Sequence, residues 1–270
     1  MQLPRILILA SPWAIKHARG ATALVLGLCA TAVAGAAPAD EASSWGLGVA
    51  AFSVQQPYTG IDRETRALPL ISYENQYVRV FGPVVELKAY SVDLGGSQRL
   101  DLRVTGKYDF SGYEAADAPI LKGMRERKSG FWAGAKATWR TGVVDVSAEL
   151  QADVTGKSKG RRASLGLEKN WRIGEHVMWT PRVSAVWVDK KYVDYYYGVA
   201  ADEARAGRVA YVGKSGVNAE LGLRGAYMID ANHSFFLDLG VTKLAKTIKD
   251  SPLVDRSTEN RAGVGYLYRF

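Results

Sequence analysis

The chain ends in the stretch Asn260-Arg261-Ala262-Gly263-Val264-Gly265-Tyr266-Leu267-Tyr268-Arg269-Phe270, which is the most informative part of the sequence. Counted back from Phe270, every second side chain is apolar or aromatic. A period of two is that of a β-strand with one apolar face and one polar or small face. A last strand with Tyr266, Tyr268 and a terminal Phe270 is typical of the closing strand of a bacterial outer-membrane β-barrel. An ordinary half-buried terminal strand is the alternative.

The N-terminal residues have the pattern of an export signal. Arg5, Lys16 and Arg19 are basic, no acidic residue precedes position 40, and residues 21–34 form an apolar stretch. That stretch is too short to span a bilayer comfortably as a helix. Small residues follow it, so cleavage is expected after Ala36 or Ala39. We therefore expect residues 1–39 to be a cleaved signal peptide and residues 40–270 to form one domain.

Composition excludes several classes of protein. Cys29, the only cysteine, lies in the apolar part of the expected signal, so residues 40–270 offer no disulfide and no thiol nucleophile. The whole chain carries a net charge of +8, and without the three basic signal residues it has 32 basic against 27 acidic residues. The two signs are interspersed, and no basic block indicates nucleic-acid binding.

Alternating hydrophobicity continues through the rest of the chain. In 144–152, for example, Val, Val, Ala, Leu and Ala alternate with Asp, Ser, Glu and Gln. No stretch after residue 40 has 18 consecutive apolar residues. We predict an all-β, transmembrane, antiparallel up-and-down β-barrel of about twelve strands. The expected strands are 45–53, 67–73, 76–82, 84–91, 98–108, 129–140, 143–153, 161–171, 177–188, 215–229, 233–242 and 258–270.

The lengths of the connections predict the orientation of the barrel. Outer-membrane barrels have short periplasmic turns and longer external loops. Five of the six odd-numbered connections are longer than every even-numbered one. The exception is a strand break placed at Gly82-Pro83, where proline cannot donate to a ladder, and the alternation of the later connections depends on that break. Both termini are then expected in the periplasm. Phe270 would lie on that side, where the barrel assembly machinery could read the aromatic residues Tyr266, Tyr268 and Phe270.

The face expected to point into the barrel carries charges of both signs. They fit either a narrow lumen filled by cross-strand salt bridges or a small water-filled channel, and the sequence leaves both open. The run Tyr195-Tyr196-Tyr197 falls in a long connection. It fits a cap or receptor surface outside the membrane, and equally an aromatic girdle segment. The inward charges are Glu86, Lys88, Arg99, Asp101, Arg103, Asp145, Glu149, Arg162, Glu168, Arg182, Glu220, Arg224 and Asp238.

Five landmarks, in order along the chain, resemble the MipA/OmpV family. They are Pro57-Tyr58-Thr59-Gly60, Leu68-Pro69-Leu70-Ile71-Ser72-Tyr73, Tyr195-Tyr196-Tyr197-Gly198-Val199 with the later Tyr211, Ser251-Pro252-Leu253-Val254, and the ending Tyr268-Arg269-Phe270. Two details depart from the family pattern. Thr59 stands where a second tyrosine is usual, and Val-Gly-Lys-Ser-Gly follows Tyr211.

The resemblance implies a place in the outer membrane of a Gram-negative envelope, in contact with its lipid. The family's name-giving member is similar to a scaffold that links a murein transglycosylase to a murein synthase. The resemblance therefore implies a non-enzymatic scaffold in peptidoglycan metabolism, with those two enzymes as partners and no cofactor. A small pore for polar solutes is the alternative function.

Few residues suit catalysis. The sequence has no Gly-x-Ser-x-Gly elbow, no His-Glu-x-x-His motif and no cysteine–histidine metal spacing. His176 and His233 fall in expected turns, where histidines are usually solvated. We predict no catalytic residue, no cofactor site and no metal site. The acidic residues of the long connection 189–214 could bind a divalent cation, although a solvated loop is the stronger interpretation.

Overall fold

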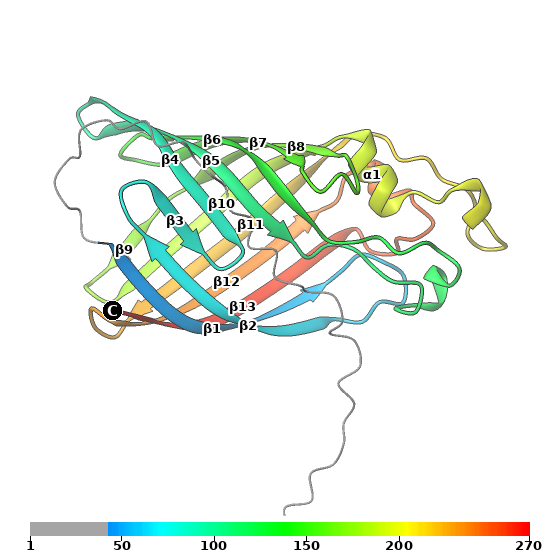
Figure 1. The fold of residues 1–270 in the computed structure, drawn as a ribbon, viewed down its shortest axis with the longest axis horizontal. Helices are drawn as coiled ribbons and strands as arrows, with labels where there is room; N and C mark the ends of the chain where they lie inside the picture. Colours follow the sequence, from blue (N-terminus) through cyan, green and yellow to red (C-terminus); the bar gives the residue numbers. More distant parts are fainter. Residues whose placement is uncertain (1–42) are drawn as a thin grey trace, which may run out of the picture. The chain divides into compact units, whose positions relative to one another are not determined.

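A computed structural model describes residues 43–270, which form a β-barrel (Figure 1). The expected signal peptide and both expected cleavage sites lie outside the described residues. The strands are β1 (Ser44–Gln55), β2 (Glu64–Glu74), β3 (Val78–Phe81), β4 (Val84–Gly95), β5 (Gln98–Asp109), β6 (Gly130–Arg140), β7 (Asp145–Asp153), β8 (Arg161–Glu168), β9 (Trp171–Ile173), β10 (Val177–Val188), β11 (Gly216–Met228), β12 (His233–Lys243) and β13 (Thr258–Arg269).

The strands close a circle of antiparallel neighbours. The terminal strand β13 pairs with both β12 and β1, and β10 pairs with β11 to complete the ring. The single strand expected at 161–171 is divided into β8 and β9, but both pair with β10 and occupy one position in the wall. The prediction of an antiparallel barrel of about twelve strands is therefore confirmed.

The two faces of the wall differ as the alternation predicted. On the outer face, apolar side chains such as Leu150, Leu165 and Leu221 are exposed. On the inner face, charged residues such as Asp101 lie among small residues and larger apolar ones such as Leu70 and Leu267. An exposed apolar belt on a closed barrel is what a bilayer requires, because no backbone edge faces lipid where the ladder is complete. Among residues 43–270, no helix is both long enough and apolar enough to cross a membrane.

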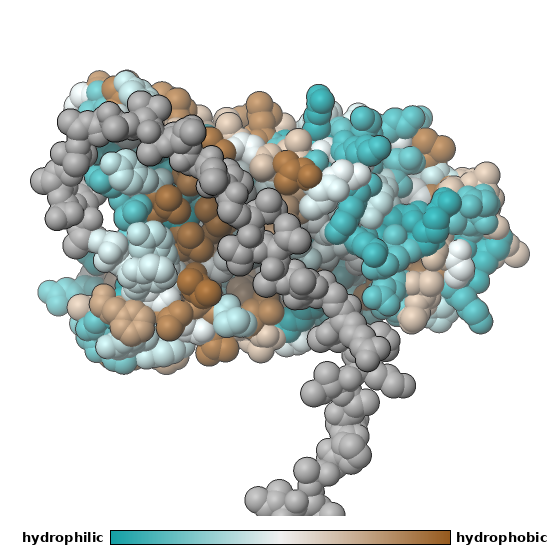
Figure 2. All heavy atoms as spheres, in the orientation of Figure 1, coloured by the Kyte–Doolittle hydropathy of each residue, from teal (hydrophilic) through white to brown (hydrophobic). Residues whose placement is uncertain are grey.

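The barrel has two unlike ends. The end that carries the connections 56–63, 110–129, 154–160, 189–215 and 244–257 is called the loop end here, and hydrophilic residues gather over it in Figure 2. The other end, called the turn end, has the connections 75–77, 96–97, 141–144, 174–176 and 229–232 and holds the C terminus. The expected break at Gly82-Pro83 is confirmed, because Phe81 pairs with Val84 around a two-residue turn. Gly82 has φ +53°, a left-handed value that favours glycine.

Candidate functional site

The connections at the loop end pack into a cap with an apolar core of its own. We use the term cap for residues 56–63, 110–129, 189–215 and 244–257. It contains the short helices η1 (Pro119–Leu121), α1 (Lys190–Tyr197), η2 (Ala201–Glu203) and α2 (Lys246–Lys249). The buried side chains shared by these segments are Tyr58, Ile61, Tyr113, Ala118, Leu121, Met124, Val193, Tyr196, Tyr197, Val199, Leu244, Ala245, Ile248 and Leu253, which pack on Trp132 and Val188 of the barrel.

Helix α1 places the tyrosine run in this core. Asp189 caps the helix, since its carboxylate accepts a hydrogen bond from the Tyr192 N–H at 2.8 Å. The helical turn directs Tyr196 and Tyr197 inward, where they are only 2% and 6% exposed. Tyr195 is half-buried and accepts a hydrogen bond from the Lys128 N–H at 2.9 Å. The run therefore belongs to a cap rather than to a free receptor surface, because helix formation buries two of its three rings.

Three of the distant sequence landmarks meet at Tyr58. Its hydroxyl donates to the Tyr196 carbonyl at 3.1 Å, and its ring stacks on Tyr197 with centroids 5.4 Å apart. The neighbouring Thr59 N–H donates to the Leu253 carbonyl at 2.9 Å. Ser251 completes the junction by donating to the Tyr197 carbonyl at 2.6 Å. The segments around residues 58, 196 and 252 thus form one contiguous unit.

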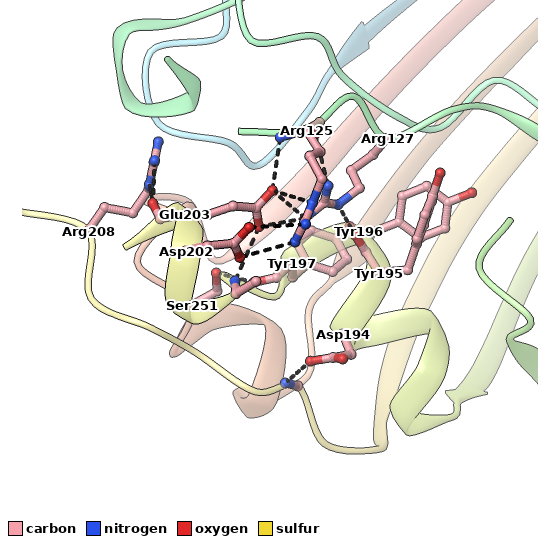
Figure 3. Close-up of polar contacts among 12 residues, drawn as sticks. Arg125, Arg127, Asp194, Tyr195, Tyr196, Tyr197, Asp202, Glu203, Arg208 and Ser251 are labelled. Carbon is pink, nitrogen blue, oxygen red and sulfur yellow. Dashed lines mark hydrogen bonds and ion pairs between the residues drawn. The ribbon is translucent and has the colours of Figure 1, made fainter. Parts of the chain in front are cut away.

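A buried ion pair ties the two longest loops together (Figure 3). The Arg127 Nη2 atom donates to Glu203 Oε2 at 2.9 Å, and both side chains are buried. Glu203 also accepts the N–H of Arg125 at 2.8 Å and that of Ala200 at 3.1 Å. Burial opposes ionisation of the Glu203 carboxyl, but these donors outweigh it and hold its pKa below the usual range. The carboxylate is therefore charged, and its oxygens are occupied by hydrogen bonds within the cap.

Arg208 provides a second buried connection. Its guanidinium donates to the carbonyls of Glu203 and Lys122, the latter at 3.1 Å, and also to that of Ile120. Backbone carbonyls of two loops thus converge on one cation, while Arg127 reaches the Tyr195 carbonyl at 2.7 Å. These contacts bury Arg127, although it stands in the charged run Arg125-Glu126-Arg127-Lys128. The sequence did not predict that Arg127 pairs with Glu203, because the two residues lie 76 positions apart in the chain.

The cap offers little chemistry. Burial raises the pKa of Tyr113 to about 12, and it raises the pKa of Tyr58 as well, so these phenols stay neutral. Asp194 accepts a hydrogen bond from the Gly213 N–H at 3.0 Å, which anchors the end of α1. The acidic residues of this loop are thus held in separate contacts. Among residues 43–270, no group of three or more histidine, cysteine or acidic side chains is arranged to hold a metal ion.

The remaining predicted residues lie at the turn end. His176 is exposed, and the His233 Nδ1 atom lies 2.5 Å from the Tyr266 hydroxyl on the outer face. Tyr268 packs edge-on against Phe270, with ring centroids 5.1 Å apart. Phe270 is 70% exposed and is joined to β1 by its N–H, which donates to the Trp45 carbonyl at 2.9 Å. The terminal aromatic residues therefore stand on the lipid-facing side of the rim.

Charged side chains inside the barrel form cross-strand pairs. Asp238 on β12 is approached by Arg182 at 2.8 Å, Arg224 at 3.4 Å and Arg261 at 3.7 Å. Glycine makes room for this cluster, because a Cβ at Gly222 would lie 2.5 Å from the Arg182 Nε atom. The inward orientation expected for the charges at 182, 224 and 238 is observed. Glycines within these strands thus serve the packing of arginines in the lumen.

The closed wall, apolar outer face, charged lumen and packed loop cap together define an outer-membrane β-barrel. The chain belongs to the MltA-interacting protein MipA family, whose model matches residues 47–270. It is 28% identical to the "Putative outer membrane protein YiaT" of Escherichia coli K12 over 236 residues, covering 85% of this chain and 92% of that protein. It is 27% identical to the MltA-interacting protein of the same strain, covering 92% of this chain and 98% of that protein.

The chain is also similar to a further relative and to two solved structures. OmpV of Vibrio cholerae is 27% identical, covering 58% of this chain and 61% of its own length. Among solved structures, the outer membrane protein OprD of Pseudomonas aeruginosa matches with a TM-score of 0.40 and 10% identity, covering 84% of this chain and 93% of OprD. A loop-deletion mutant of Vibrio cholerae OmpT matches with a TM-score of 0.38 and 8% identity, covering 85% and 98%.

Proposed function

We propose that this chain is a non-enzymatic scaffold that holds a murein transglycosylase, together with a murein synthase, at the outer membrane. The observation that supports this best is its alignment with nearly the whole MltA-interacting protein of Escherichia coli, a relative named for its partner. The fold alone would not carry this proposal, since barrels host many functions. The burial of the cap's polar groups in internal contacts agrees with a role in which the protein binds partners rather than transforms substrates.

The turn end is the surface that we assign to these partners. Its short turns would face the periplasm, where murein lies, if the usual rule of short periplasmic turns applies. Exposed aliphatic side chains lie in or directly beside three of these turns, namely Val143, Ile173 and Ile229. Exposed apolar residues on neighbouring turns are common at docking sites. Because the turns are small, the interface would be at the low end of stable protein–protein contacts.

A small pore, the alternative that the inward charges left open, is not favoured by the interior. The cap packs at the loop end, around Trp132 and Val188 of the wall. Further along the lumen, Phe81 of β3 contacts Phe236 of β12, with ring centroids 6.1 Å apart, although these strands are not neighbours in the wall. Both features narrow the path through the barrel.

The test is co-purification of the transglycosylase with the tagged full-length protein in mild detergent. We expect Val143→Asp at the turn end to reduce the recovered enzyme, because a charge in an apolar contact is costly. Val209→Asp is the matched control, since Val143 and Val209 are both 68% exposed but Val209 belongs to the cap. Equal recovery with both variants would contradict the assigned surface. Failure of the unaltered protein to retain either murein enzyme would contradict the scaffold itself.

A further inference from the structure

The barrel wall has a discontinuity at β3. This strand pairs with only Ser72–Glu74 of β2 and Val84–Leu87 of β4. Within residues 43–270, no strand lies beside residues 89–95 of β4 on this side, or beside 64–70 of β2. Pro69, which has no N–H, falls in the free segment of β2, as is usual for edges. At a free edge, the inner and outer faces of a sheet meet.

A cavity of about 500 Å³ lies along the free edge of β4. Its lining combines side chains from both faces of the wall, including inward Arg99 and Arg140 and outward Leu102. A β-bulge between Lys88 and Tyr90 re-aims the strand at this point. Bulges of this kind are frequent beside functional sites. The cavity is therefore accessible from the lumen side and from the lipid side.

Cationic groups outnumber carboxylates in the ion-pair network at this cavity, by five to three. Two further carboxylates, Asp93 and Asp145, lie opposite Arg99 and Arg140 in the strand register but form no ion pair with them among residues 43–270. Arg99 and Arg140 share the single carboxylate of Asp101, at 3.0 and 2.9 Å, and both guanidinium groups remain about half exposed. Guanidinium groups bind phosphate oxygens through paired hydrogen bonds. The network thus has the charge and the donors for a phosphate group.

An apolar trough of about 700 Å³ begins where this cavity ends. The two share Ala89, Leu102 and Arg103 in their linings. From there the trough crosses the lipid-facing side of the wall, over strands β5 to β8 and on to Trp187 of β10. Its floor is made of small outward side chains, including Ala137 and Ala148, which stand beside larger ones. A flexible hydrocarbon chain fits such a floor, because small residues permit close approach.

We propose that the cavity and trough together bind an anionic phospholipid from the membrane leaflet at the turn end. Its phosphate lies between Arg99 and Arg140, and one acyl chain follows the trough. Exposed Tyr77 and Tyr90 stand at the cavity, as aromatic residues do at the level of lipid headgroups. Charge selects the headgroup, and the trough distinguishes a lipid from a soluble phosphate.

The experiment is native mass spectrometry of the purified full-length protein in detergent, with added phosphatidylglycerol or phosphatidylethanolamine. We expect bound phosphatidylglycerol to exceed bound phosphatidylethanolamine. The variant R99Q/R140Q should lower phosphatidylglycerol binding by about tenfold or more, since charge-assisted hydrogen bonds are lost. R224Q is the control, because the Arg224 side chain is 52% exposed, against 53% for Arg99, and also pairs with a lumen aspartate. It should bind the lipid as the unaltered protein does.

A second pair of variants tests the trough. Ala148→Phe fills its floor and should weaken lipid binding, whereas Ala51→Phe on the outer face of β1 should not. Heat-modifiable migration in gels verifies that every variant is a folded barrel. Unchanged lipid binding by R99Q/R140Q, or an equal loss in R224Q, would overturn the site. Two results together would show a site for phosphate alone: millimolar inorganic phosphate displaces the lipid, and Ala148→Phe binds the lipid as well as the unaltered protein does.

Discussion

The Arg127 guanidinium donates to the Glu203 carboxylate at 2.9 Å, and this buried pair joins two loops that are 76 residues apart in the chain. The pair lies in the cap, next to the rings of Tyr113 and Tyr195, whose centroids are 5.8 and 5.7 Å from the guanidinium carbon. Charge, aromatic packing and backbone contacts therefore act on the same junction. Changes at Glu203 should loosen the cap without opening the barrel ladder.

Glu203→Ala should destabilise the cap by about 3–5 kcal/mol, because it leaves the Arg127 charge buried without a partner. Limited trypsin digestion of the folded protein, followed by mass spectrometry, would detect faster cleavage in 110–129 and 189–215. Asp202→Ala is the control, since Asp202 pairs with Arg125 at 3.2 Å but both side chains are largely exposed. That change should cost under about 1 kcal/mol. Equal rates of trypsin cleavage in the Glu203→Ala and Asp202→Ala variants would contradict a structural role for the buried pair.

The same pair predicts a pH dependence. The pKa of Glu203 is lowered in the folded cap, so its ionised form contributes stability above the ordinary pKa of 4.5. That contribution is lost as the pH falls through the lowered pKa. Hydrogen–deuterium exchange, corrected for intrinsic rates, should show increased exchange in the cap as the pH falls below the ordinary pKa of 4.5 and through the lowered pKa of Glu203. Glu203→Gln should remove this pH dependence. If Glu203→Gln kept the full pH response, another titrating group would be responsible.

The orientation of the barrel can be tested with single cysteines. The only natural cysteine, Cys29, lies in the expected signal, so an introduced thiol would be the only one in the mature protein. A membrane-impermeant maleimide should label Val209→Cys in intact cells, because the cap is expected to face outward. It should label Val143→Cys only after the outer membrane is permeabilised. The opposite pattern would place the termini outside the cell.

Deletion of Phe270 should impair assembly more than stability. Its ring is 70% exposed and packs edge-on against Tyr268, so little packing is lost. We expect less folded barrel in the outer membrane of cells, measured by heat-modifiable migration, but normal refolding in detergent. Phe131→Ala, at an exposed aromatic residue near the loop end, should leave the amount in cells unchanged. An equal decrease in cells and in detergent would indicate a stability effect rather than recognition by the assembly machinery.

Local residue patterns along the chain are enough to predict the wall of this barrel. A period of two in strands such as β7 and β13 fixes which side chains face lipid and which face the lumen, and this property is local to each strand. Even the break at Gly82-Pro83 could be predicted, because proline lacks an N–H and glycine accepts a positive φ. The division of 161–171 into β8 and β9 could not be predicted. Both segments pair with β10, so the pattern of inward and outward residues gives no sign of the break.

The roles of the loops and of the discontinuity at β3 depend on contacts between residues that lie far apart in the chain. Arg127 and Glu203, or Tyr58 and Tyr197, are ordinary loop residues until the chain brings them together, and no short-range pattern encodes pairs so distant in sequence. The free edge of β4 likewise follows from how few residues of β3 pair with each neighbour. Side chains from both faces of a wall can line one cavity only at a free strand edge. The pairing register of β3 with β2 and β4 determines where that edge lies.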